Sequence, residues 1–371
     1  MFLVDINKEP IGYANAFESI FWAEVLMLRY IMPALLVLVV SFNFDCKKNP
    51  TGPPIGNIDT TNNNFSWSID TLGFQGIIHD VAIVNDTLVY AVGEIYSTDS
   101  IGHIDPVLYN LAVWNGTQWS IERQYYQGRL APINTVFVQD EHNIWLDPWF
   151  HSDGLIIEER NIDSIFYGVG IRKMWGNSSN LYVVGTNGFI GYFNGTFWQK
   201  IPSVTALNIV DLWGMYDSSN GNWEILAVAN KLGENYQNNI IKIQGSTAEL
   251  ISASPINYPL STVWFIPDRH YYVAGSGIYE KNQIAESLWR NGLYEISQYY
   301  VSAIRGNSVN DVFAAGGASG ELLHYNGARW NSFRQLISLS DGAFSTISVQ
   351  GKRVIAGGAS GPHAIVVLGK R

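Results

Sequence analysis

One short pattern recurs along this chain and constrains its fold more than any other feature. Its clearest copy is Asp311–Trp330 (DVFAAGGASGELLHYNGARW), which has an apolar run ending in glycine, a second apolar run, an Asn-Gly pair and a tryptophan. Leu181–Trp198 repeats it almost position for position, and Leu88–Trp119 repeats it with an insertion at Glu94–Val107. Because Asn-Gly favours the tight type I′ turn, each copy predicts consecutive antiparallel strands.

The spacing of the copies predicts the architecture. Glycines that close the second strand of a copy follow one another at intervals of 92, 90, 41 and 41 residues, at Gly93, Gly185, Gly275, Gly316 and Gly357. These intervals correspond to two, two, one and one repeat of about 40–46 residues, a length typical of a four-stranded β-propeller blade. The composition, with 47% hydrophobic and 15% charged residues, suits a large all-β core.

The two ends of the repeat region predict how the ring closes. Phe65–Ile69 resembles the last strand of a copy but has no copy before it, while the C-terminal copy stops after its third strand, Ala364–Leu368. We therefore predict an all-β, seven-bladed propeller in which the N-terminal strand completes the last blade, since an open ring would leave two unpaired edges. The inner strands are expected to begin near Ile78, Ile133, Ile171, Ile209, Leu260, Val301 and Phe344.

The N-terminal region carries a different signal. The apolar run Ile31–Phe44 is short for a membrane span and typical of the core of a signal peptide. Acidic residues before it do not suit a signal peptide, so we interpret residues 1–26 as an upstream extension with the true start at Met27. Residues 27–46 are then a signal or anchor helix, residues 47–64 a flexible tether rich in Pro, Gly, Asn and Thr, and residues 65–371 the propeller.

The only cysteine, Cys46, follows that apolar run and is succeeded by two lysines. This segment resembles the processing site of bacterial lipoproteins, which implies a lipid on Cys46 and an exported chain facing the periplasm or held at the outer membrane. Asn43, Phe44 and Asp45 depart from the Leu, Ala/Ser and Gly/Ala usual in that family, Asp45 most of all. An uncleaved or conventionally cleaved signal, or a structural cysteine, therefore remains open.

The repeats themselves also resemble a known group. Ile304–Val312 and His324–Trp330 match the blade pattern Ile-x-Gly-x-x-x-Asn-Asp-Val…His-Tyr-Asn-Gly-x-x-Trp of seven-bladed propellers from secreted bacterial lipoproteins. The resemblance covers Phe65–Arg371 and implies a surface-tethered propeller. Some members of the group bear a glucosyltransferase label, but this sequence has no Asp-x-Asp metal motif and no α/β alternation to support one.

Candidate ligand-binding residues lie at the ends of the expected inner strands. Trp175, Trp213, Phe265 and Arg305, with Phe137 in the weakest repeat, could line one mouth of the central channel. A ring of aromatic side chains with one arginine suits a sugar or an anionic peptide side chain. The alternative is that these side chains close the channel as hydrophobic packing.

Two loop histidines are further candidates, because long propeller loops often carry recognition. His103 lies in the insertion, between Asp99 and Asp105, and His151 lies between Asp147 and Asp153. Neither set has the spacing of a known metal site, so the sequence predicts no metal and no cofactor, and both sets can equally be solvated loop residues.

The functional expectation has three alternatives, of which one is a scaffold subunit of an envelope complex, recognisable by an exposed apolar patch on the outer strands. A net charge of −10 without a basic stripe argues against nucleic acid as a partner. We expect a monomeric, envelope-tethered, non-enzymatic module that binds a protein or a glycan through one rim, with no catalytic residues. The other alternative is a carbohydrate-active enzyme (glycosidase, lyase or glucosyltransferase-like) in the central channel. Two carboxylates at the mouth, about 5–10 Å apart, would favour the enzyme, and aromatics with amides would favour binding.

Overall fold

The computed structural model describes residues 60–99, 101–161, 163–177, 179–233, 235–291, 300–317, 320–337, 339 and 341–371. The described residues all belong to one compact unit, which ends at Arg371. The predicted upstream extension, the signal segment with Cys46 and the tether as far as Asp59 lie outside the described residues. In the part that is described, no helix is long and apolar enough to cross a membrane.

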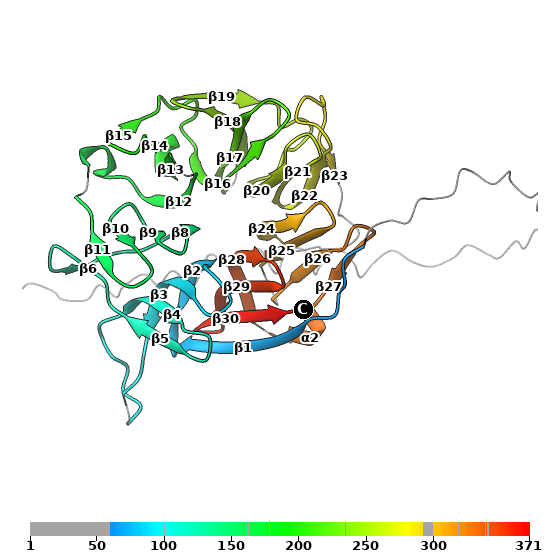
Figure 1. The fold of residues 1–371 in the computed structure, drawn as a ribbon. Helices are drawn as coiled ribbons and strands as arrows, with labels where there is room; N and C mark the ends of the chain where they lie inside the picture. The colour runs from blue at the N-terminus through cyan, green and yellow to red at the C-terminus, as the bar shows by residue number, and fades with distance from the viewer. Residues whose placement is uncertain are drawn as a thin grey trace, which may run out of the picture. The chain divides into compact units, whose positions relative to one another are not determined.

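The strands of the described residues form seven four-stranded antiparallel sheets and one two-stranded ribbon (Figure 1). The first four sheets are β2 (Gln75–Ile83), β3 (Val89–Tyr96), β4 (Tyr109–Trp114), β5 (Trp119–Glu122); β8 (Val136–Asp140), β9 (Asn143–Leu146), β10 (Phe150–Ser152), β11 (Ile157–Glu159); β12 (Ile171–Gly176), β13 (Leu181–Gly185), β14 (Ile190–Phe193), β15 (Trp198–Lys200); and β16 (Asn208–Asp217), β17 (Asn222–Lys231), β18 (Gln237–Gln244), β19 (Thr247–Ile251).

The other three sheets are β20 (Leu260–Ile266), β21 (His270–Gly275), β22 (Gly277–Lys281), β23 (Arg290–Asn291); β24 (Val301–Ser308), β25 (Asp311–Gly316), β26 (Leu322–Tyr325), β27 (Trp330–Ser332); and β28 (Gly342–Gln350), β29 (Arg353–Ser360), β30 (His363–Lys370), β1 (Ser66–Gly73). The ribbon consists of β6 (Tyr125–Tyr126) and β7 (Arg129–Leu130). The first strand of each of the first six sheets and β28 of the seventh contact one another in ring order, β2–β8–β12–β16–β20–β24–β28–β2, so these strands surround a central channel.

The ring closes as the sequence predicts. β1 pairs antiparallel with β30, with Trp67 opposite Gly369 and Ile69 opposite Val367, so the N-terminal strand is the outermost strand of the last sheet (Figure 1). Helical segments among the described residues are short: η2 (Ser164–Phe166), η3 (Thr186–Gly188) and α2 (Arg334–Ile337). They lie in connections outside the innermost strands, so the all-β propeller fold is confirmed.

Six of the seven innermost strands carry a β-bulge at the same position of the repeat. The register shifts at Ile78/Asp80, Ile171/Lys173, Ile209/Asp211, Leu260/Thr262, Val301/Ala303 and Phe344/Thr346. A bulge re-aims the side chains that follow it, and here those side chains surround the channel. The second sheet differs: β8 begins at Val136, three residues after the predicted start at Ile133. There the backbone N–H groups of Asn134 and Thr135 donate to the carboxylate of Asp147 at 3.2 and 2.9 Å, instead of to a neighbouring strand.

The end of the predicted tether differs from the expectation of a flexible segment. Thr61 donates from its N–H to the carbonyl of Asn326 at 3.0 Å and from its hydroxyl to the carbonyl of Asn310 at 2.6 Å. Asn63 Oδ1 lies 2.5 Å from Nδ1 of the buried His324. The chain is therefore attached to the sixth sheet from Thr61 onward, before β1 begins.

Candidate functional site

Two buried ion pairs join innermost strands of different sheets around the channel. The residue after the bulge is, in ring order, Asp80, Lys173, Asp211, Thr262, Ala303 and Thr346, and Thr135, just before β8, holds the matching position of the second repeat. Lys173 Nζ lies 2.6 and 2.7 Å from the two oxygens of Asp80, which also accept hydrogen bonds from the hydroxyls of Thr135 at 2.9 Å and Thr346 at 2.7 Å. Burial favours the neutral carboxyl, but the ammonium of Lys173 and these hydrogen bonds hold the pKa of Asp80 below its usual value.

The second ion pair repeats this arrangement on the far side of the ring. Asp211 accepts from the hydroxyl of Thr262 at 2.7 Å, and Arg305 Nη1 and Nη2 donate to its two oxygens at 3.1 and 2.8 Å. The guanidinium of Arg305 also lies over the ring of Trp213, 5.1 Å from its centroid. We call the ring positions together with Arg305 the waist. Its two carboxylates balance its two cations, so the waist is formally neutral.

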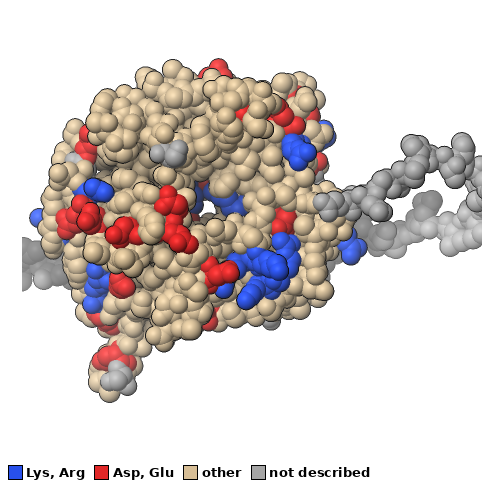
Figure 2. Space-filling view, in the orientation of Figure 1, with Lys and Arg blue, Asp and Glu red and all other residues tan. Residues whose placement is uncertain are grey.

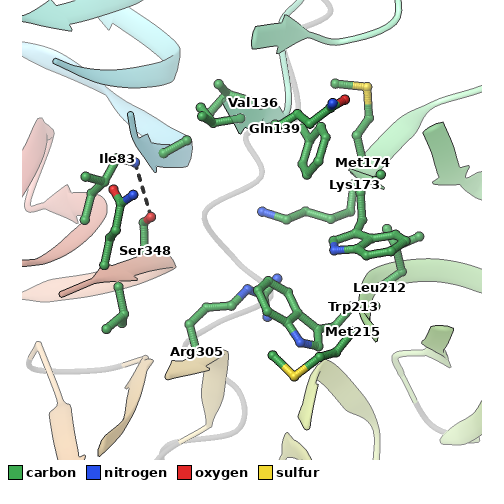
Figure 3. A pocket seen from close by; sticks show the side chains of 18 of the residues that line it. Ile83, Val136, Gln139, Lys173, Met174, Leu212, Trp213, Met215, Arg305 and Ser348 are labelled. Atoms are coloured by element: carbon green, nitrogen blue, oxygen red, sulfur yellow. Dashed lines mark hydrogen bonds between the residues drawn. The ribbon is translucent and has the colours of Figure 1, made fainter. Parts of the chain in front are cut away.

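A cavity of about 740 Å³ opens on one side of the waist (Figure 3). Its floor includes Lys173 and Arg305, which extend from different walls toward its middle (Figure 3). Figure 2 shows a central hollow with Lys and Arg side chains at its bottom. The walls are aliphatic and aromatic, with Phe137, Trp175, Trp213, Tyr216 and Trp223 as the aromatics, and Gln139, Asn177 and Gln350 supply amides. We call this cavity the wide mouth.

An aromatic row leads from the core to the rim of the wide mouth. The ring of the buried Trp175 lies 5.5 Å from that of Trp223, which in turn lies 5.6 Å from Tyr216. Trp223 and Tyr216 come from the hairpin of β16 and β17, both ten residues long, and are 40% and 50% exposed. These two faces are available to a ligand, whereas Trp175 supports them from below.

The structure brings together most of the predicted channel residues. Trp175, Trp213, Arg305 and Phe137 all line the wide mouth, but Phe265 does not. Phe265 is 0% exposed and stacks on Tyr271 at 5.2 Å in the core beside the fifth sheet. The residue at the matching repeat position is Trp264, one place earlier, and a shift of one residue turns a strand side chain to the opposite face.

The two loop histidines lie outside the wide mouth. His103 is exposed with Nδ1 3.5 Å from Asp99, while Asp105 pairs instead with Arg123 at 2.5 Å. His151 packs edge-on against Trp145 at 4.9 Å and has Nδ1 3.2 Å from Arg160 Nη2. Within the described residues, no group of three or more His, Cys, Asp or Glu side chains could hold a metal ion.

Sequence reasoning missed the waist and one buried acid. Asp80 and Asp211 each stand two residues after the apolar start of an inner strand, so aligning the repeats would have shown charges inside otherwise apolar segments. Asp147, considered only as a partner of His151, is buried with a left-handed φ of 47°. Burial raises the pKa of Asp147 to about 7, against the opposing effect of the N–H groups of Thr135 and Asn134.

The carboxylates decide what this arrangement can do. Asp140 is the one carboxylate among the residues that line the wide mouth, and it is occupied by the backbone N–H of His142 at 2.8 Å and the amide of Asn143. Asp80 and Asp211 are buried and held in ion pairs. The described lining of the wide mouth therefore lacks the two carboxylates that glycoside hydrolysis uses, and its aromatic and amide groups suit binding.

Comparisons with known proteins agree on the fold. No family model matches the sequence, and no curated protein matches it. Among solved structures, YCF48 bound to D1 peptide is similar with a TM-score of 0.60 and 16% identity, over 85% of this chain and 97% of that one. The WD40 β-propeller domain of Doa1 is similar with a TM-score of 0.55 and 12% identity, over 83% and 98%.

A third similar structure is the extracellular domain of the putative one-component system BT4673 from B. thetaiotaomicron. Its TM-score is 0.57 at 10% identity, over 84% of this chain and 40% of that one. At these identities the likeness establishes the class of fold, a β-propeller, and no more.

Proposed function

We propose that this chain is an exported, non-enzymatic propeller that binds a segment of a partner protein at the wide mouth. The observation that carries the proposal is the lining of that cavity: exposed aromatic faces, aliphatic walls and a few amides above a neutral floor. Binding sites typically combine a largely apolar concave surface with a small number of fixed polar groups. Trp and Tyr are also the residues that most often dominate binding energy at protein interfaces.

The waist limits which ligand groups can be recognised there. Arg305 and Lys173 are each already paired with an aspartate, so a ligand gains little from long-range charge attraction. We expect an apolar or aromatic side chain of the partner to pack against Trp213 and Trp223. A carboxylate of the partner would add a short-range hydrogen bond to the remaining donors of Arg305, since a guanidinium has five N–H groups. That YCF48 is a propeller solved with a bound peptide favours a protein segment over a glycan.

We also propose attachment to the cell envelope. The apolar run before Cys46 supports export, a lipid on Cys46 would anchor the chain at the outer membrane or facing the periplasm, and the extracellular-domain propeller of BT4673 is a similar fold in an exported setting. A monomer on a short tether would keep the wide mouth accessible. Labelling with an alkyne analogue of palmitate in a bacterial host tests this: we expect incorporation in the wild type and none in Cys46→Ser, and labelling of neither would contradict the anchor.

The binding proposal is tested by selecting peptides from a phage-displayed random library on the purified chain. We expect enriched peptides with micromolar dissociation constants that weaken at least tenfold in Trp223→Ala, because the exposed indole face is lost. Phe197→Ala is the matched control, since Phe197 is exposed but does not line the cavity. No enrichment, or peptides that bind Trp223→Ala and the wild type equally, would contradict a peptide site at the wide mouth.

A further inference from the structure

A second cavity, of about 540 Å³, lies between the fourth and fifth sheets. Its walls come from residues 205–207 before β16, residues 236–239 at the start of β18 and residues 256–257 before β20. None of these residues lines the wide mouth. Because β17 runs from the rim residue Trp223 toward Lys231, the turn that leads into β18 lies at the opposite end of the fourth sheet. We call this cavity the amide pocket.

The amide pocket is held together by hydrogen bonds between its three loops. The hydroxyl of Thr205 donates to Asn239 Oδ1 at 2.6 Å, which joins the first loop to the second. Nδ2 of Asn238 donates to the carbonyls of Ile256 at 3.1 Å and Tyr258 at 2.7 Å, which joins the second loop to the third. The cavity is therefore formed before any ligand arrives, and binding need not order the loops.

The lining offers many polar groups and no charge. Its side chains are amide, hydroxyl, phenol or aliphatic, with no Lys, Arg, His, Asp or Glu among them. The side chains of Tyr236, Gln237 and Asn257 make no hydrogen bond to any other residue in the described part of the chain, and Tyr236 is 56% exposed. Each free amide has both donors and acceptors. Asn239 keeps its two N–H donors because only its oxygen is used.

We propose that the amide pocket binds a neutral saccharide. A pyranose ring has an apolar face of C–H groups, which can stack on the exposed ring of Tyr236, and adjacent hydroxyls that both donate and accept, which match the free amides of Gln237, Asn239 and Asn257. A charged ligand would find no opposite charge in the lining, and a purely apolar one would leave the amides unpaired at a cost. This site is independent of the peptide site at the wide mouth.

The test is to titrate the purified chain with sugars and to measure binding by NMR and calorimetry. The sugars are glucose, galactose, mannose, N-acetylglucosamine and their β-linked disaccharides, with glucuronate as an anionic comparison. We expect millimolar binding of at least one neutral sugar, weakened at least fivefold by Tyr236→Ala and by Gln237→Ala and retained in Tyr236→Phe. Tyr167→Ala is the matched control, since Tyr167 is exposed and lines neither cavity. Peptides selected at the wide mouth should bind Tyr236→Ala as they bind the wild type.

Three results would overturn the assignment: no neutral sugar of the panel binds at high millimolar concentration, binding is equal in Tyr236→Ala and the wild type, or glucuronate binds more tightly than glucose. Thermal unfolding of each variant distinguishes a loss of binding at the pocket from a loss of folding. Because Tyr236 and Gln237 are exposed, we expect their substitution to leave the melting temperature nearly unchanged.

Discussion

Arg371 forms a two-point ion pair with Asp311, with Nη1 2.9 Å from Oδ1 and Nη2 2.6 Å from Oδ2. Asp311 also accepts from Nε2 of the buried His324 at 2.8 Å, and the guanidinium of Arg371 lies over the ring of Phe65, 5.2 Å from its centroid. Phe65 precedes β1 and Arg371 follows β30, so both flank the same end of the β1–β30 pairing, and Arg371 joins that end to a buried carboxylate of the sixth sheet. Burial would favour the neutral acid, but His324 and Arg371 lower the pKa of Asp311 to about 2.

Removing this ion pair should loosen the closure of the ring. We expect Arg371→Ala to lower the free energy of unfolding by about 2–4 kcal/mol, because it leaves the carboxylate of Asp311 buried with one partner fewer. Urea unfolding measures the change. Arg353→Ala is the matched control, since its partner Asp86 is 89% exposed and a surface pair is worth about 1 kcal/mol or less. Equal losses in the two variants would contradict a special role for Arg371.

The waist should depend on complete pairing. We expect Lys173→Met to destabilise the fold by about 3–5 kcal/mol, since Asp80 would remain charged and buried without its cation. The double variant Asp80→Asn/Lys173→Met should be less destabilised than Lys173→Met alone, because it removes both charges. Urea unfolding of Lys173→Met, Asp80→Asn and the double variant gives the coupling free energy between the two side chains. Additive losses would show that the pair does not act as a unit.

Asp147 should make stability depend on pH. In the unfolded chain an aspartate ionises near pH 4, whereas burial raises the pKa of Asp147 to about 7 in the fold. Between these values the folded protein holds a proton that the unfolded chain has released, so this group's contribution falls as the pH rises from about 4 to about 7. We expect the stability of Asp147→Asn relative to the wild type to increase by about 2–4 kcal/mol over that range.

Asparagine tolerates the left-handed backbone at this position and keeps an acceptor for the N–H groups of Asn134 and Thr135. Unfolding measured at pH 4.5, 6 and 7.5 checks the prediction, with the exposed Glu249→Gln as control. A stability difference between Asp147→Asn and the wild type that does not change with pH would contradict it.

Gly214 should be required for the shape of the wide mouth. A Cβ at this position would lie 2.4 Å from the ring of Trp175, which supports Trp223 at the rim. We expect Gly214→Ala to displace Trp175, lower stability by about 1–3 kcal/mol and weaken peptides selected at the wide mouth. Gly317→Ala is the control, since its nearest neighbour would be 3.5 Å away. Urea unfolding measures the loss of stability, and peptide titration measures the loss of binding. Unchanged peptide binding would show that the position of Trp175 does not matter for peptide recognition.

The repeat pattern was sufficient to predict the strands and the closing pair, because each depends on local signals. Apolar runs and Asn-Gly turns specify hairpins within one repeat. The strand that begins at Phe65 has no repeat before it, so it needs the free edge of another sheet as its partner. Aligned positions also placed Trp213 and Arg305 at the same mouth. The placement of Phe265 at the mouth was wrong, since nothing in an apolar run of strand shows which face a side chain takes. The matching residue Trp264 is also fully buried, and neither residue lines the wide mouth.

The waist and the amide pocket could not be predicted in the same way. Asp80 and Lys173 are 93 residues apart, and Asp211 and Arg305 are 94 apart, so their pairing depends on the radius and twist of the ring. The raised pKa of Asp147 depends on burial that a loop-like segment (DPWFHSD) does not reveal. Attachment of Thr61 and Asn63 was missed because a Pro- and Asn-rich segment has no apolar period to show that its polar groups have partners.

The pairing of β1 with β30 has a consequence for synthesis on the ribosome. β1 is made first among the strands and its partner last, so Trp67 and Gly369 meet only after the whole ring has left the exit tunnel. Until then the nascent protein carries an unsatisfied strand edge at Ser66–Gly73, open to pairing with the wrong chain. A chaperone that shields this segment until β30 is available would protect the nascent protein from aggregation.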